Sequence, residues 1–216
     1  MKKRLYSILY MFVITFVFTA IVTGIYAANE NRIALNEKTK LSRIILTVLN
    51  IKLAPDAPDK EVLQTFEKRV ERKSLNGKSY YRGLSQDGKT VIGYAFPLQG
   101  AGLWGQIYGM MGVEPGLKKV LGLAFYKHSE TPGLGGRITE SWFVDQFKGK
   151  ELKPAGKGKE YFYLVPPGKA KGPNEVDAIT GATLTSEGVE RFMNRDLEEY
   201  LPIIAKQEGL KVSMAK

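Results

Sequence analysis

The sequence predicts an α+β protein in which an N-terminal transmembrane helix precedes a domain of largely antiparallel sheet covered by helices. Two observations support this class. An uncharged apolar run lies near the N-terminus, and from Ser79 onwards short β-like runs are followed by one long amphipathic helical pattern. A chain of 216 residues with 44% hydrophobic content suits one globular domain with a small appendage. We expect residues 1–28 to form a cytoplasmic tip and the transmembrane anchor, residues 29–78 a helical connector, and residues 79–216 the globular domain.

The anchor is the apolar run Leu5–Ala27, which contains no charged residue. A helix needs about 20 apolar residues to cross a bilayer, so this run is long enough. A cleaved signal peptide is the alternative, because the run ends in small residues, but its apolar core is normally about 7 to 15 residues long. The basic stretch Lys2–Arg4 precedes the run, so the positive-inside rule places the N-terminus in the cytoplasm. The rest of the chain should then lie outside the cytoplasmic (inner) membrane, anchored by a single pass.

The connector is expected to be helical throughout. Residues 30–51 continue as a helix with apolar side chains at near-helical spacing, and residues 55–73 form a turn followed by a second helix. In that second helix Asp59 is the expected N-cap, and Val62, Phe66 and Val70 fall on one face.

The domain begins with four short β-like runs at residues 79–84, 90–100, 120–128 and 161–165, separated by turn signals such as Asp87-Gly88. Residues 140–150 predict a short helix between strands, and Gly188–Gln207 is the best amphipathic helix of the chain. The apolar stripe of that helix consists of Val189, Phe192, Met193, Leu197, Tyr200, Leu201 and Ile204.

The composition excludes several classes of function. The chain has no cysteine and a single histidine, His128, which removes thiolate catalysis, disulfides, iron–sulfur clusters and multi-histidine metal centres. The net charge is +10, but the basic residues are scattered among acidic ones and the expected location opposes nucleic-acid binding. We interpret the surplus charge as solvated faces attracted to anionic lipid headgroups near the anchor. No catalytic residue and no metal site are expected.

Hydroxyl residues crowd at Thr180, Thr183, Thr185 and Ser186, just before the long helix, which we expect to begin near Thr185. One Ser or Thr is enough to cap a helix, so four exceed that need. The amino end of a helix presents unpaired N–H groups and a positive dipole, which suit a bound phosphate. The pattern leaves two interpretations open, phosphate binding and ordinary capping by Ser186.

Two glycine-rich stretches are further candidates for a binding site. In residues 127–138 (KHSETPGLGGRI) the glycines would let the backbone approach a flat ligand, with Glu130 and Thr131 for hydrogen bonds and Leu134 for apolar contact. A long loop without a ligand is the alternative. In residues 100–109 (GAGLWGQIYG), Trp104 is either an aromatic wall for a ring system or a core residue. His128 is expected to be a loop or strand-end histidine rather than a catalytic base.

Together, FPLQGAGLWGQIYG, FYKHSETPGLGGRI and DAITGATLTS, in this order behind one anchor, resemble a known family. This is the family of the FMN-binding C subunit of the Na⁺-translocating NADH:quinone reductase and its relative, the G subunit of the Rnf complex. The resemblance covers about Val91 to Val189. It implies a phosphoester between FMN and Thr183 and flavin contacts from Trp104, Glu130, Thr131 and Leu134. Members of the family often have a lysine before the third motif, and here Lys169, Lys171 or neither takes its place. From their position beside Thr183, Thr185 and Ser186 are expected to cap the helix and to donate hydrogen bonds to the phosphate oxygens.

The resemblance also implies a function. The chain would be a membrane-anchored, extracytoplasmic flavoprotein subunit that relays electrons through covalent FMN in an ion-translocating oxidoreductase complex, without autonomous catalysis. FMN would supply the redox chemistry, and the protein would attach, orient and tune it. The expected partners are other membrane subunits of the complex, a flavin transferase for maturation, and membrane lipid. The alternatives are an FMN-tethered electron carrier of another extracytoplasmic reductase system and a redox-silent binding module.

Overall fold

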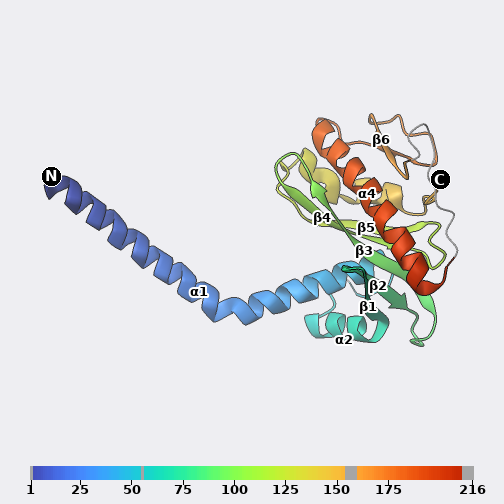
Figure 1. Ribbon diagram of the computed structural model, residues 1–216, viewed down its shortest axis with the longest axis horizontal. Coiled ribbons are helices and arrows are strands. Elements are labelled where there is room, and N and C mark those ends of the chain that lie inside the picture. The colour runs from blue at the N-terminus through green and yellow to red at the C-terminus, as the bar shows by residue number, and fades with distance from the viewer. Residues whose placement is uncertain (1, 55, 154–159, 211–216) are drawn as a thin grey trace. The chain divides into compact units, whose positions relative to one another are not determined.

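The computed structural model describes residues 2–54, 56–153 and 160–210 and divides into two compact units, one ending at Leu41 and one beginning at Ser42 (Figure 1). The first unit lies within helix α1 (Lys2–Val48), whose described side chains before Thr39 are almost all exposed. Among the described residues, α1 is the one helix long and apolar enough to cross a membrane, with a mean hydropathy of 2.4 in its most apolar window. The expected continuation of the apolar helix through residues 30–48 is confirmed.

The second unit is built on a five-stranded antiparallel sheet whose strands are neighbours in chain order. The strands are β1 (Val70–Leu75), β2 (Lys78–Leu84), β3 (Val91–Ala101), β4 (Gln106–Val113) and β5 (Val120–Lys127). Short turns join them. At the first turn Asn76 and Gly77 have φ of 53° and 78°, the left-handed conformation that a two-residue hairpin of this kind requires.

Two expectations for this region are wrong, and one strand was not expected. The second helix is α2 (Asp59–Arg69), whose N-cap is Pro58 and not Asp59. Val70, expected on the apolar face of that helix, begins β1 and pairs with Gly83 of β2, because a β-branched residue before a tight hairpin gains more from strand pairing than from another helical turn. Strand β4 is not predicted by the sequence pattern, since its glycines interrupt the apolar alternation.

Helix α4 (Thr183–Glu208) covers one face of the sheet (Figure 1). The predicted apolar stripe of this helix is confirmed, because all seven of its residues are buried in the main hydrophobic cluster. The stripe packs on Tyr94, Phe96 and Leu98 of β3, and the ring of Phe96 stacks on that of Tyr200 with 5.0 Å between centroids. The α+β class, with an antiparallel sheet covered by helices, is therefore confirmed.

The opposite face of the sheet is covered by the end of α1 and the residues that follow it. Val48 and Leu49 are 1% exposed there. A Cβ atom on Gly112 would lie 2.0 Å from the carbonyl oxygen of Val48, and one on Gly83 would lie 3.0 Å from a methyl carbon of Leu49. The strands therefore carry glycine where this segment approaches them. Residues from Ser42 onwards pack with the sheet, although the sequence assigns them to the connector.

The remaining elements lie beside α4. Strands β6 (Tyr163–Val165) and β7 (Glu175–Asp177) form a parallel pair, so the strand expected over 161–165 is confirmed for its last three residues. The short helix expected over residues 140–150 is α3 (Ser141–Val144), which lies between the 3-10 turns η1 (Gly135–Thr139) and η2 (Asp145–Phe147).

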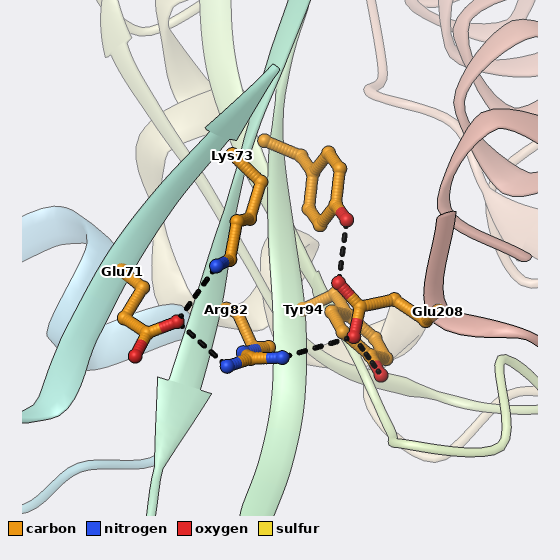
Figure 2. A network of polar contacts seen from close by, with 6 residues as sticks. Glu71, Lys73, Arg82, Tyr94 and Glu208 are labelled. Carbon is orange, nitrogen blue, oxygen red and sulfur yellow. Dashed lines mark hydrogen bonds and ion pairs between the residues drawn. The ribbon is translucent and has the colours of Figure 1, made fainter. Parts of the chain in front are cut away.

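A polar network holds the carboxyl end of α4 on the sheet (Figure 2). Glu208 accepts a hydrogen bond from the hydroxyl of Tyr80 at 2.6 Å and pairs with Arg82 at 3.3 Å. Arg82 also pairs with Glu71 of β1 at 2.7 Å. Burial, followed by the charge and hydrogen bond of Glu208, raises the pKa of Tyr94 to about 12. The carboxyl end of α4 is therefore held on three strands of the sheet. The candidate site lies at the other end of this helix.

Candidate functional site

The candidate site lies at the amino end of α4, where three loops meet. α4 begins at Thr183, two residues before the expected start, and follows Gly181, which has a φ of 75°. Its N-cap is Ala182, which makes no side-chain capping hydrogen bond. The prediction that Thr185 and Ser186 cap the helix is therefore wrong, because both lie inside the first turn. The N–H groups of that turn precede the first intrahelical bond, which runs from Ser186 N to Ala182 O, so they stay free for an anion.

The crowded hydroxyls divide into two pairs. Thr185 and Ser186 are 1% and 2% exposed and are used inside the protein. The hydroxyl of Thr185 donates to Glu130 at 2.5 Å, and that of Ser186 donates to the carbonyl of Ala182 at 3.0 Å while accepting from Ile179 N at 3.2 Å. Thr180 and Thr183 are exposed. Within the described part of the chain the Thr183 hydroxyl has no hydrogen-bond partner, so it is accessible for chemistry.

Glu130 connects all three sequence motifs. Its side chain is 4% exposed. One carboxylate oxygen accepts a hydrogen bond from Trp104 N at 2.9 Å, and the other accepts the bond from Thr185. The N–H of Glu130 donates to Nδ1 of His128 at 3.2 Å, so His128 is a partly buried strand-end histidine, as expected. The loop after β3, the loop after β5 and the first turn of α4 are thus joined at one carboxylate.

Exposed apolar side chains surround this junction. Trp104 is 68% exposed and Leu134 is 44% exposed, so neither is a core residue. Sequence reasoning missed three further exposed residues, namely Leu103 in the loop after β3, Trp142 in α3 and Leu184 in the first turn of α4. These five are the only large exposed hydrophobic side chains in the described residues from Ser42 onwards. Their concentration at one place marks a surface that binds a ligand or a partner. In the ribbon of Figure 1, the start of α4 lies beside the β3–β4 hairpin.

The loops are in direct contact. A Cβ atom on Gly181 would lie 3.2 Å from Leu134, and one on Gly188 would lie 2.6 Å from the carbonyl oxygen of Ala101, at the end of β3. Arg137 lies over the ring of Trp142, with 5.0 Å to its centroid, and pairs with Glu140 at 3.1 Å. Hydrogen bonds from Trp142 and then from Arg137 lower the pKa of Glu140. Trp142 is therefore held at the edge of the surface.

The two candidate lysines are not brought to a defined contact. Lys169 and Lys171 are exposed, and their backbone N–H groups donate to Asp177 at 3.0 Å and Glu175 at 2.8 Å. Neither ammonium group donates a hydrogen bond to the described residues. Thr131 is exposed at the start of the ETPGLG turn, where its carbonyl accepts from the N–H groups of Leu134 and Gly136.

The residues present fit a flavin mononucleotide. An uncapped helix end with free N–H groups suits the phosphate, the exposed Thr183 hydroxyl lies on that first turn, and the apolar side chains of Trp104 and Leu134 suit the faces of a flat ring. Gly181 has a φ of 75°, which lets the backbone turn directly before the N-cap of the helix without strain.

Comparison with known proteins gives the same assignment. Residues 102–198 match the family model of the FMN-binding domain. The chain is 32% identical over 167 residues to the C subunit of the Na⁺-translocating NADH-quinone reductase of Pasteurella multocida, covering 71% of this chain and 64% of that protein. It is 39% identical over 113 residues to the C subunit of the same enzyme in Neisseria meningitidis serogroup B, covering 51% and 42%.

Two solved structures have the same fold. Shewanella oneidensis NqrC superposes with a TM-score of 0.65 at 26% identity, over 75% of this chain and 93% of that chain. The C subunit of the Na⁺-translocating NADH-quinone reductase from Parabacteroides distasonis has a TM-score of 0.64 at 26% identity, over 78% and 92%. The chain spans only 42% to 64% of the length of the curated relatives named above. Residues 102–198 are therefore similar to an FMN-binding domain, and the chain is similar in both sequence and fold to the C subunit of the Na⁺-translocating NADH-quinone reductase.

Proposed function

We propose that this protein is a membrane-anchored, extracytoplasmic flavoprotein subunit that relays electrons through covalently bound FMN in an ion-translocating oxidoreductase complex. The observation that carries the proposal is the junction at the amino end of α4. There an exposed hydroxyl at Thr183, free helix N–H groups and the exposed side chains of Trp104 and Leu134 meet in one place. The match to the FMN-binding domain over residues 102–198 supports the cofactor.

Each part of the site has a distinct task in this proposal. FMN, when bound, accepts and donates electrons. Thr183 carries the phosphate as an ester, and the first-turn N–H groups and positive end of the α4 dipole stabilise its charge. Trp104 and Leu134 hold the ring and exclude water from it. The backbone of the Glu130–Thr131 segment shapes the turn that presents Leu134.

The attachment site is tested by gel fluorescence and peptide mapping of protein produced together with a flavin transferase. The wild type should keep a fluorescent band after denaturation, with one FMN, less a water, on Thr183. Thr183→Ala should abolish the band, whereas Thr180→Ala, a matched exposed threonine of the same turn, should keep it. Thr185→Ala should keep at least part of it, because its hydroxyl is buried and engaged with Glu130. A flavin that leaves on denaturation, or that maps to Thr180 or Thr185, would refute the ester at Thr183.

The orientation is tested separately. The basic Lys2–Arg4 stretch before the apolar part of α1 supports a cytoplasmic N-terminus and an extracytoplasmic flavin domain. Protease added to spheroplasts should digest the domain. Digestion only in inside-out vesicles would reverse the proposed topology and require a different electron path.

The partners follow from the same proposal. An electron carrier needs a donor and an acceptor, which we take to be other membrane subunits of the complex. A flavin transferase would supply the FMN, and lipid would surround the apolar part of α1. Affinity purification from the native membrane in mild detergent should recover multi-span redox subunits. Recovery of the chain alone, with flavin attached, would favour an independent carrier.

A further inference from the structure

The carboxylate of Glu130 occupies a space that two glycines keep open. A Cβ atom on Gly102, in the loop after β3, would lie 2.5 Å from one carboxylate oxygen. A Cβ atom on Gly135, after the ETPGLG turn, would lie 2.7 Å from the other oxygen and 2.5 Å from the hydroxyl of Thr185. Real Cβ contacts are never this short. Gly102 and Gly135 therefore leave room for the side chain of Glu130, whereas the sequence suggested that such glycines admit a ligand.

Glu130 is held by hydrogen bonds and not by a cation. Within the described ranges, no lysine, arginine or histidine pairs with its carboxylate. A buried carboxylate is costly unless donors satisfy its oxygens, and here the donors are the N–H of Trp104 and the hydroxyl of Thr185. These two donors come from segments far apart in the sequence, and each adjoins a group of the candidate site. Trp104 is one of its exposed apolar residues, and Thr185 is two residues from Thr183.

We propose that Glu130 is the positioning residue of the site: its carboxylate sets the distance between the Trp104 loop and the first turn of α4, and so the placement of the flavin ring relative to its attachment point. The part that concerns the flavin rests on the proposed function. The part that concerns the two loops does not. The carboxylate of Glu130 acts through Trp104 and Thr185, because both of its oxygens are engaged by these two donors.

The conservative variant Glu130→Gln tests this role. An amide keeps the shape of the side chain, but only its oxygen accepts hydrogen bonds. One of the two charge-assisted bonds therefore becomes a weaker neutral one, and the other is lost or must reverse its direction. The matched control is Glu187→Gln, which removes the same charge from an exposed position in the first turns of α4. Thr185→Val removes the second donor while leaving Glu130 in place, and Thr185→Ser restores a hydroxyl.

The first experiment uses the full chain in mild detergent, produced without flavin transferase, and measures backbone hydrogen exchange by mass spectrometry. Glu130→Gln should speed exchange at least tenfold in peptides covering residues 102–105 and 183–187, while the β1–β2 hairpin keeps its wild-type rate. Thr185→Val should do the same, and Glu187→Gln should not. A uniform acceleration across all peptides, or none, would overturn the proposal, because the first indicates general loss of stability and the second no coupling.

The second experiment uses flavin-loaded protein. Glu130→Gln and Thr185→Val should each lower the visible circular dichroism of the flavin to half or less, because the ring is no longer held in one orientation, while Thr185→Ser and Glu187→Gln keep the wild-type signal. Glu130→Gln should also raise the equilibrium constant for flavin reduction about tenfold, or about 30 mV for two electrons, because a buried negative charge is lost near the ring. Wild-type dichroism and potential in Glu130→Gln would refute the positioning role. A wild type that takes up no flavin would instead refute the proposed function, and the exchange experiment would still decide the role of Glu130.

Discussion

At the candidate site, the substitution Gly188→Ala has two opposing effects on stability: it raises helix propensity and it creates a steric overlap. Alanine in a helix interior is more favourable than glycine by about 1 kcal/mol, so propensity alone predicts a stabilised α4. In this structure, however, the new Cβ atom would lie 2.6 Å from the carbonyl oxygen of Ala101 and 3.5 Å from the Cα of Gly102. Both are backbone atoms at the end of β3 and cannot rotate away. Overpacking of this kind costs about 1–3 kcal/mol, so we expect the gain from propensity to be cancelled, with a net loss of up to about 2 kcal/mol in the free energy of unfolding.

The assay is urea unfolding of the full chain in mild detergent, followed by far-UV circular dichroism. Glu187→Ala is the control, because it adds helix propensity at an exposed neighbour without a new contact. In Gly188→Ala, backbone hydrogen exchange should be faster than in the wild type at the first turn of α4 and in the Trp104 loop, because the added methyl group pushes these two segments apart. A Gly188→Ala protein that is more stable than the wild type by about 1 kcal/mol would refute the reasoning, since propensity would then outweigh contact.

Three further substitutions have defined outcomes. Trp104→Leu should lower the free energy of unfolding by less than about 1 kcal/mol, because the side chain is 68% exposed, and it should shift the flavin spectrum. A loss of about 3–5 kcal/mol, which is typical of a buried aromatic residue, would show that Trp104 is a core residue. The pKa of Tyr94 is raised in the folded protein to about 12, so its contribution to stability is complete below its unfolded pKa of about 10 and is lost as the pH rises from about 10 through 12. Urea unfolding between these pH values should therefore show a shallower decline in Tyr94→Phe than in the wild type, and parallel curves would exclude the shift. Asn194→Ala should lower the free energy of unfolding by about 2–4 kcal/mol, because the buried Asn194 accepts hydrogen bonds from the N–H groups of Tyr161 and Phe162 and both donors would lose their partner. A loss below about 1 kcal/mol would mean that water replaces the lost side chain.

The sequence predicts the parts of the fold whose signals are local. The apolar stripe of α4 is visible because its residues repeat at helical spacing, and that stripe is buried as expected. The hairpin between β1 and β2 also has a local signal, Asn76-Gly77, but the helical pattern before it hides the start of β1 at Val70. The need for Gly112 in β4 has no local signal, because this glycine makes room for Val48, which lies far away in the sequence.

The candidate site shows the same division. The motifs that contain Trp104, Leu134 and Thr183 can be recognised in the sequence, and the structure brings them together. The internal use of Thr185 cannot be recognised there, since its hydroxyl bonds to a carboxylate 55 positions away. Capping was assigned to the wrong residues because hydroxyl side chains favour caps in general, whereas here their tertiary partners take them inside the first turn.

The packing of Val48 and Leu49 against glycines of the sheet determines the N-terminal boundary that a truncated fragment should have. Removing the apolar run is the usual route to a water-soluble fragment, and a fragment that starts at residue 79 would follow the predicted domain boundary. Such a fragment would lack β1 together with Val48 and Leu49, and one whole face of the sheet would meet solvent. A fragment that starts before Ser42 keeps that face closed. We therefore expect a fragment to need the last turns of the long N-terminal helix in order to fold on its own.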